Sequence, residues 1–167
     1  MTTPPIDPRT DPARVYRDAI GHFATGVTVV TAIGPGGPGG MTTNAVTSLS
    51  LDPRLLLVCF AADSRTLEVV RESRRFAVNI LRAGDEDLAA VFASKVIGPQ
   101  KFADVTHTEE HGVPVLDRAL AWIACDLLEL RPGGDHEIGI GSVLATGYGE
   151  PGEPLVFFGG RYTTIAG

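Results

Sequence analysis

The pattern of apolar and polar positions along this chain favours short strands over long helices. Runs rich in apolar and β-branched residues are separated by short segments that contain Gly or Pro, which is typical of strands joined by turns. Strands connected so directly indicate a mainly β fold, an antiparallel barrel with two to three peripheral helices, and not a doubly wound sheet. The predicted strands cover residues 27–33, 40–50, 54–61, 75–81, 119–131, 136–149 and 154–162.

Three segments carry helix signals instead. The first, within residues 11–26, has Asp11 as a predicted N-cap, Pro12 at the first helical position and Gly26 beyond its end. Ser64 or Thr66 is expected to begin a second helix. The second and third helices are predicted over residues 67–74 and 84–95.

Two further segments are predicted as loops. Residues 34–40, GPGGPGG, lack the Lys-Ser/Thr ending of a phosphate-binding loop, so we expect a flexible hairpin tip. Residues 98–114 are polar and irregular, and residues 94–113 form a candidate lid. Residues 1–14 are predicted to be a flexible N-terminal segment, and residues 15–167 a single domain.

Composition and charge narrow the class of protein. The chain has 167 residues, 44% of them apolar, and a net charge of -6 without any basic run, so we expect no nucleic-acid partner. Neither a signal peptide nor a membrane span is visible, which predicts a cytoplasmic protein without a membrane partner. Cys59 and Cys125 each lie in an apolar stretch and are expected to be buried, reduced thiols.

The stretch GMTTNAVTSLSLDP, residues 40–53, carries an unusual number of short polar side chains. If it forms one strand, Thr42, Asn44, Ser48 and Ser50 share a face. Such a face is commonly solvated, but residues 40–51 contain no charged residue, which instead favours a ligand.

Two histidine-containing segments are candidates for chemistry. His107 and His111 in HTEEH match an inverted zinc-protease pattern, but the Gly and Pro that follow argue against the helix it requires, so we expect no metal. His136 follows a Gly-Gly-Asp turn at the start of a strand, where it is either a structural histidine or a residue that projects into a cleft.

Taken together, several segments resemble the short-chain flavin reductases, the reductase components of two-component flavin-dependent monooxygenases. The resemblance covers residues 15–163, and its most specific parts are the Thr-rich segment ending in SLSLDP and the GDH turn. Arg54 departs from the family, which often has a second proline there. The segments that carry the resemblance are FATGVTVVTA, GMTTNAVTSLSLDPRLLLVCF, RFAVNIL, KFADV, GVPVLDRALAWIACDLLE, GDHEIGIGSV and PLVFFGGRY.

The resemblance implies an FMN-binding split β-barrel that forms a homodimer and binds FAD or FMN, with NADH as co-substrate. Hydride would pass from nicotinamide to flavin N5, and His136, Arg161 and Tyr162 would contact the nicotinamide, with His136 as the one catalytic residue. Either Lys95 or Lys101 would meet the flavin. The residues implied to bind flavin are Thr42, Thr43, Asn44, Ala45, Ser48, Leu49, Ser50, Cys59, Phe60, Ala61, Ser64, Arg65, Thr66, Phe92, Lys95, Lys101 and Phe102.

The sequence is compatible with three alternative functions. A pyridoxamine-phosphate-oxidase-like enzyme would need a basic cluster that the sequence lacks. A flavin carrier without reductase activity would share most of the flavin-binding residues but would not need His136. A β-barrel without a ligand is disfavoured by the uncharged hydroxyl-bearing face. The absence of an arginine cluster favours NADH over NADPH, whereas FAD and FMN are not distinguished.

Overall fold

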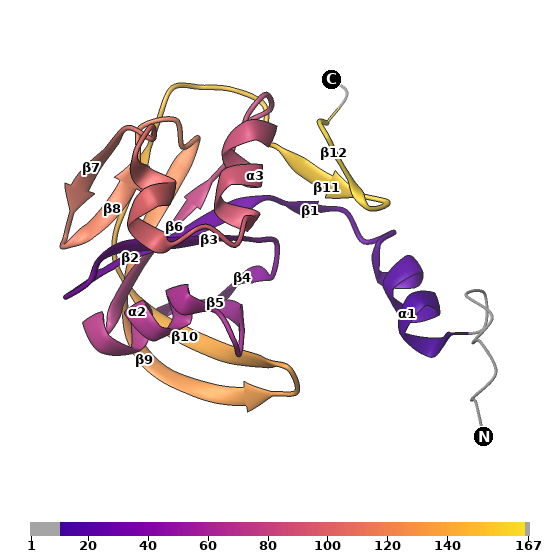
Figure 1. Ribbon diagram of the computed structural model, residues 1–167, viewed down its shortest axis with the longest axis horizontal. Helices are drawn as coiled ribbons and strands as arrows, with labels where there is room; N and C mark the ends of the chain where they lie inside the picture. Colours follow the sequence, from indigo (N-terminus) through magenta and orange to yellow (C-terminus); the bar gives the residue numbers. More distant parts are fainter. Residues whose placement is uncertain (1–10, 166–167) are drawn as a thin grey trace.

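The computed structural model describes residues 11–165 as a predominantly antiparallel β structure with three α-helices, α1–α3 (Figure 1). The helices are α1 (Pro12–Ile20), α2 (Arg65–Ser73) and α3 (Glu86–Ala93), with a 3-10 helix, η1 (Gly98–Phe102). The strands are β1 (Thr25–Gly26), β2 (Thr28–Gly34), β3 (Gly37–Thr43), β4 (Val46–Leu51), β5 (Arg54–Ala61), β6 (Arg75–Ile80), β7 (His107–Glu110), β8 (Val113–Leu116), β9 (Ala121–Gly133), β10 (His136–Tyr148), β11 (Val156–Phe158) and β12 (Arg161–Thr163).

The main sheet has seven strands in the order β3-β2-β6-β9-β10-β5-β4. Its two edge strands, β3 and β4, are consecutive in the chain and are joined only by Asn44 and Ala45. In a flat sheet six spacings of about 4.8 Å would separate these edges by about 29 Å. The chain from Thr43 to Val46 spans at most about 11 Å. The sheet therefore curls until its edges meet, which produces the split barrel predicted from the sequence.

Two glycines of β10 make room for the aromatic core of this barrel. A Cβ on Gly139 would lie 2.7 Å from Phe60 Cε2, and one on Gly141 would lie 2.7 Å from Phe76 Cζ. Phe60 and Phe76 are fully buried and pack edge to face at 6.0 Å between ring centroids. The alternating Gly residues of β10 therefore face the interior.

Strand β2 is buried on both faces because elements pack on each side of it. Val30 faces the barrel interior, together with residues of α2, whereas Val29 belongs to a second core under α3. Helix α2 packs against β2, β3 and β6, and α3 packs against β3 and β2. Figure 1 shows α2 and α3 close to the barrel, whereas α1 projects away from it.

The hairpin β7–β8 is joined to the barrel by a buried polar network. The Asn79 Nδ2 group donates to the Val29 carbonyl and to Thr31 Oγ1, both at 3.0 Å. Its Oδ1 accepts a hydrogen bond of 2.9 Å from the backbone N–H of Leu116, and Thr31 Oγ1 donates to the Pro114 carbonyl. Asn79 and Thr31 are fully buried, so their polar groups cannot bond to water and need each other and the neighbouring backbone as hydrogen-bond partners.

Several predicted elements agree with the structure. Asp11 is the N-cap of α1, with its carboxylate accepting from the Ala13 N–H at 3.1 Å, and Ser64 is the N-cap residue of α2. Cys125 is buried as predicted, whereas the prediction was wrong for Cys59, which is half-buried because it lies on the outward face of β5; both are free thiols. The predicted flexible segment 1–14 lies largely outside the described residues.

Three predictions about local structure were wrong. Residues 40–50 are not one strand, because the chain turns at Asn44 and Ala45 between β3 and β4, and a bulge follows Ser48. Only the turn after Gly34 forms the tip of the first hairpin, since residues 37–40 belong to β3. Residues 98–114 are not irregular: they contain η1, β7 and the start of β8.

We predict that Asn79→Ala lowers the free energy of unfolding by about 1–3 kcal/mol, because buried partners lose their hydrogen bonds. Chemical denaturation of this variant and of the wild-type protein measures the difference. The matched control is Gln100→Ala, which shortens an exposed amide side chain and should change stability by less than about 0.5 kcal/mol. Equal stability of the Asn79 variant and the wild type would contradict a structural role for the network.

Candidate functional site

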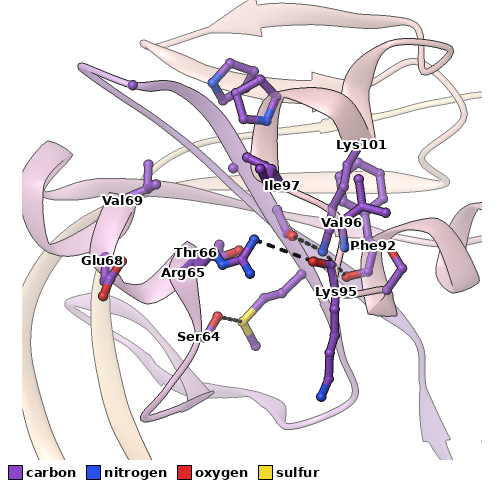
Figure 2. A pocket seen from close by; sticks show the side chains of 18 of the residues that line it. Ser64, Arg65, Thr66, Glu68, Val69, Phe92, Lys95, Val96, Ile97 and Lys101 are labelled. Atoms are coloured by element: carbon purple, nitrogen blue, oxygen red, sulfur yellow. Dashed lines mark hydrogen bonds between the residues drawn. The ribbon is translucent and has the colours of Figure 1, made fainter.

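A pocket of about 580 Å³ lies between β3, the N-terminal half of α2 and residues 92–101, and we call it the α2 pocket (Figure 2). Of the residues implied by the resemblance, it brings together eight. These are Thr42, Ala61, Ser64, Arg65, Thr66, Phe92, Lys95 and Lys101.

Three cations line the α2 pocket, Arg65, Lys95 and Lys101, and none of them is paired with a carboxylate among the described residues. Lys101 is 8% exposed, and its Nζ donates only to the carbonyl oxygens of Phe92, at 2.8 Å, and Gly40, at 3.2 Å. Arg65 reaches across the pocket toward the carbonyl of Lys95, with 3.5 Å between Nη1 and the oxygen. Burial of Lys101, and secondly the charge of Arg65, lower the pKa of the Lys101 ammonium.

The N-terminus of α2 adds further donors to this wall. The first amides of a helix have no acceptor within the helix. Ser64 provides no side-chain cap for them, because its hydroxyl lies 3.3 Å from the sulfur of Met41. The helix terminus, Arg65 and Lys101 together make the α2 pocket suitable for a phosphate or another anion.

A second surface adjoins the α2 pocket at Ala61. Leu56, Val58 and Phe60 of β5 point into the core, so the intervening residues face outward. Ala61 lies opposite His136 and Cys59 opposite Ile138 in the β5–β10 ladder. The Cys59 N–H also donates to the Ala45 carbonyl at 2.9 Å. We call Ala45, Cys59, Ala61 and His136 the β5 surface; it contains no Lys, Arg, Asp or Glu.

His136 is held at the end of the β5 surface by two contacts of its turn. Its Nδ1 lies 2.7 Å from Asp135 Oδ1, and this hydrogen bond lowers the pKa of the Asp135 carboxyl. The Asp135 carbonyl accepts from the Ala62 N–H at 3.0 Å, which joins the turn to the segment before α2. The GDH turn therefore lies beside both the α2 pocket and the β5 surface.

The hydroxyl and amide groups of the Thr-rich segment mostly support the backbone. Thr42 Oγ1 donates to the Ala89 carbonyl of α3 at 2.6 Å, and Thr43 Oγ1 accepts from the Ala45 N–H at 3.1 Å. Asn44 Nδ2 donates to Thr25 Oγ1 at 3.0 Å. The expected common face of Thr42, Asn44, Ser48 and Ser50 does not exist, because these residues are divided between β3, the link and β4.

Other predicted site residues lie outside the α2 pocket. Ser48 and Leu49 are exposed on the edge strand β4, and Ser50 is half-buried there. Phe60 and Phe102 are core residues, and Phe102 packs behind Phe92 with 5.1 Å between the ring centroids.

Within this chain Arg161 and Tyr162 do not lie near His136. They lie on β12, where Tyr162 packs against Phe157, and Figure 1 shows β12 far from the β9–β10 turn that carries His136. The expected lid is also smaller than predicted: residues 94–99 border the pocket, whereas the β7–β8 hairpin packs on β2 and β6.

Sequence reasoning missed the glycine-rich wall of the α2 pocket. A Cβ on Gly40 would lie 2.6 Å from Phe92 Cε1, and one on Gly98 would lie 2.8 Å from the Pro38 carbonyl oxygen. Glycine within a strand pattern indicates a close approach by another element, and that signal was present in GPGGPGG.

The HTEEH segment forms β7 and the turn after it, so His107 and His111 do not lie on one helical face. Within residues 11–165 no three His, Cys, Asp or Glu side chains are grouped so that they could hold a metal ion. None of the helices in this part of the chain is long and apolar enough to cross a bilayer.

The curled seven-stranded sheet and the cationic α2 pocket define this chain as a split barrel that can bind an anionic ligand. The model of the flavin reductase like domain family matches residues 20–166, and the chain belongs to this family.

Named relatives agree with this assignment. The reductase component of 4-nitrophenol 4-monooxygenase/4-nitrocatechol 2-monooxygenase from Rhodococcus opacus is 41% identical over 88% of this chain and 78% of its own length. FMN reductase (NADH) RutF 2 of Rhizobium rhizogenes is 36% identical over 98% of this chain and 95% of its own. The solved structure of the NADH:FAD oxidoreductase SgcE6 from Streptomyces globisporus is 36% identical, with a TM-score of 0.87 and 100% of both chains covered.

We predict that the lowered pKa of Lys101 makes stability depend on pH in a specific direction. Between that lowered pKa and the ordinary value of 10.5, the unfolded chain binds more protons at this residue than the folded chain. The contribution of Lys101 to the free energy of unfolding therefore rises with pH in this window. Urea denaturation of wild type and Lys101→Met at about pH 8 and about pH 10 measures it. The free energy of unfolding of the wild type minus that of the variant should be larger at the higher pH.

Lys95→Met is the matched control, because it removes an exposed lysine from the same wall. If the free energy of unfolding of the wild type minus that of Lys101→Met fell as the pH rose, burial would not disfavour the charged ammonium.

Proposed function

We propose that this protein is an NADH-dependent flavin reductase that supplies reduced flavin to a partner monooxygenase. The observation that carries the proposal is the α2 pocket, where Arg65 and the buried Lys101 face the N-terminus of α2 beside the uncharged β5 surface. The relatives named above as FMN reductase (NADH), NADH:FAD oxidoreductase and monooxygenase reductase component support the same activity.

The fit to a flavin nucleotide follows from the donors present. Arg65, Lys101 and the first amides of α2 would hold the phosphate, because each offers an N–H to an anion. The uncharged, outward-facing β5 surface suits an isoalloxazine ring, with the outward-facing residues of β5 and the Ala45 backbone along it. Thr43, Asn44, Ser48, Leu49 and Ser50 remain proposed contacts for the ring and ribityl chain.

The flavin and the nicotinamide supply the redox chemistry themselves, as hydride passes from C4 of the nicotinamide to N5 of the flavin. The chain contributes positioning. His136 lies next to Ala61, and its ring is oriented by the hydrogen bond to Asp135, so we assign it to the nicotinamide side of the site. This role requires no proton transfer by His136. Because reduced flavin must leave for the monooxygenase, the open β5 surface is consistent with release.

We predict NADH oxidation that depends on added FAD or FMN. In His136→Ala the KM for NADH should rise roughly 3- to 10-fold, the loss expected for one hydrogen bond, with little change in flavin Kd. Steady-state kinetics with NADH and flavin titrations measure the two quantities separately.

The control is His111→Asn, which alters a histidine away from the site at a positive φ of 53° that Asn tolerates. Flavin binding without NADH oxidation would indicate a carrier and overturn the reductase proposal. Unchanged kinetics in His136→Ala would remove His136 from the nicotinamide site.

We also propose a homodimer located in the cytoplasm, where NADH is available. Helix α1 has no buried residue; the exposed fractions of Tyr16 and Ile20 are 69% and 51%, and that of Phe23, three residues after the helix, is 71%. A helix of nine residues is marginal in isolation, so a cover for this apolar face would stabilise it. A second copy of the chain is the proposed cover.

The double substitution Ile20→Ser with Phe23→Ser should weaken dimerisation at least about tenfold, because it removes apolar area equivalent to more than about 1.4 kcal/mol. Sedimentation equilibrium measures the dissociation constant, with Arg14→Ser on the same helix as control. A wild-type monomer at all concentrations would refute the dimer.

A further inference from the structure

The N-terminal end of β10 carries His136 and has few supports of its own. Strand β5 ends at Ala61, which is the partner of His136, so the β5–β10 ladder does not extend into the turn. Residues 131–135 of the β9–β10 turn are all exposed, and Gly134 lies at a positive φ of 75°. The position of His136 therefore depends on the contacts that join this end of the hairpin to its surroundings.

Glu137, the residue after His136, faces the interior of the barrel. Successive residues of a strand point to opposite faces. His136 lies opposite Ala61 on the outward face, whereas Glu137 lies opposite Phe60, which is fully buried in the core. The side chains of directly opposite residues share a face. Glu137 thus places a carboxylate at the end of the core, and a contact of this side chain acts on the backbone that carries His136.

Helix α2 closes this end of the barrel and supplies the partner of Glu137. Leu67 and Val70 are fully buried in the core cluster that contains Phe60. Arg71 follows in the last turn of α2, and its Nη2 donates to Glu137 Oε1; we call this ion pair the Arg71–Glu137 pair. The two side chains are 42% and 22% exposed, so little water is available to replace Arg71 at the carboxylate. Among the described residues it is the only ion pair between α2 and the β9–β10 hairpin.

Helix α2 does not need the Arg71–Glu137 pair to stay in place. Arg74, the C-cap residue of α2, donates from Nη2 to the carbonyl oxygens of Leu127, at 2.8 Å, and Leu128, at 3.0 Å. These bonds and the buried face of the helix fix α2 independently of the ion pair. Neither member of the pair lines the α2 pocket. The pair therefore acts on the end of the hairpin, and not on the helix or on the anion site.

We propose that the Arg71–Glu137 pair positions His136 beside Ala61 and so contributes to nicotinamide binding, although neither residue of the pair contacts a cofactor. When one charge is removed, the other is left partly buried and unpaired, which is costly. The remaining side chain then moves toward water, and the backbone at Glu137 moves with it. The imidazole of His136 is displaced as a result. The proposal rests on the role given to His136 in the proposed flavin reductase.

Steady-state kinetics of charge-removing variants test the positioning role. In Arg71→Met and in Glu137→Gln, the KM for NADH should rise about 2- to 5-fold, less than in His136→Ala, with kcat and flavin Kd within about twofold of the wild type. Arg71→Lys keeps the charge and should have a KM near that of the wild type. The matched control, Glu129→Gln, breaks the exposed pair of Glu129 with Arg131 on the same hairpin and should leave the KM unchanged.

A double-variant cycle separates positioning from a general loss of structure. If Arg71 acts through His136, Arg71→Met should have no further effect on the KM for NADH in the His136→Ala background. Thermal unfolding verifies that each variant folds. Additive effects of Arg71→Met and His136→Ala would contradict the proposal. So would an Arg71→Lys variant whose KM is as high as that of Arg71→Met.

Nuclear magnetic resonance of the imidazole nitrogens tests the positioning without any activity. The chain has four histidines, so the signal of His136 is assigned as the one missing from His136→Ala. In Arg71→Met the His136 signal should shift or broaden, whereas the signals of His22, His107 and His111 should not. An unchanged His136 signal together with an unchanged KM would overturn the proposal. If the wild type did not oxidise NADH, the proposed function would fail, and the His136 signal alone would decide whether the pair positions this side chain.

Discussion

The two-residue link between β3 and β4 is the constraint on which the rest of the molecule depends. Asn44 and Ala45 connect the two outermost strands of a seven-stranded sheet, so the sheet must close on itself. Closure places Ala45 against Cys59 on β5, and the β5–β10 ladder then places His136 opposite Ala61. The hydrogen bonds of Thr43 and Asn44 fix the same link. The short polar side chains of this segment thus form the barrel seam, and the outward surface beside it is a consequence of that seam.

The unneutralised positive charge of the α2 pocket favours an anionic ligand independently of the shape of the pocket. A lysine that is 8% exposed loses much of its hydration, and two carbonyl oxygens replace only part of it. The neighbouring Arg65 adds repulsion, since both are cations. Among the described residues no carboxylate neutralises the pair, so a bound phosphate would relieve both the desolvation and the repulsion. A neutral ligand would relieve neither, which is why these positions favour a nucleotide over a ring alone.

Much of the fold could be predicted from the sequence, because strand and helix signals are local. The α1 N-cap, the long β9–β10 hairpin and the strand before α2 all follow from such patterns. The division of residues 40–50 could not be predicted in this way, since the turn at Asn44 results from barrel closure and not from a Gly or Pro. The glycine-rich segment was misread for a similar reason: its glycines accommodate Phe92 and the segment at Gly98, which are distant in sequence. For the site, residue types identified Arg65 and Lys101, but only the tertiary structure distinguishes the buried Lys101 from the exposed Lys95.

The division of the site into a cationic pocket and an open surface bears on how a reductase releases its product. Hydride transfer alters the ring, while the phosphate and whatever follows it are unchanged. If Arg65 and Lys101 hold the phosphate, as proposed, their contribution to affinity is shared by oxidised and reduced flavin. A difference in affinity between the two forms would then come from the β5 surface, which consists of Ala45, Cys59, Ala61 and the imidazole of His136. In the proposed arrangement a surface of that kind offers few interactions specific to the oxidised ring, so oxidised and reduced flavin would compete for the same site.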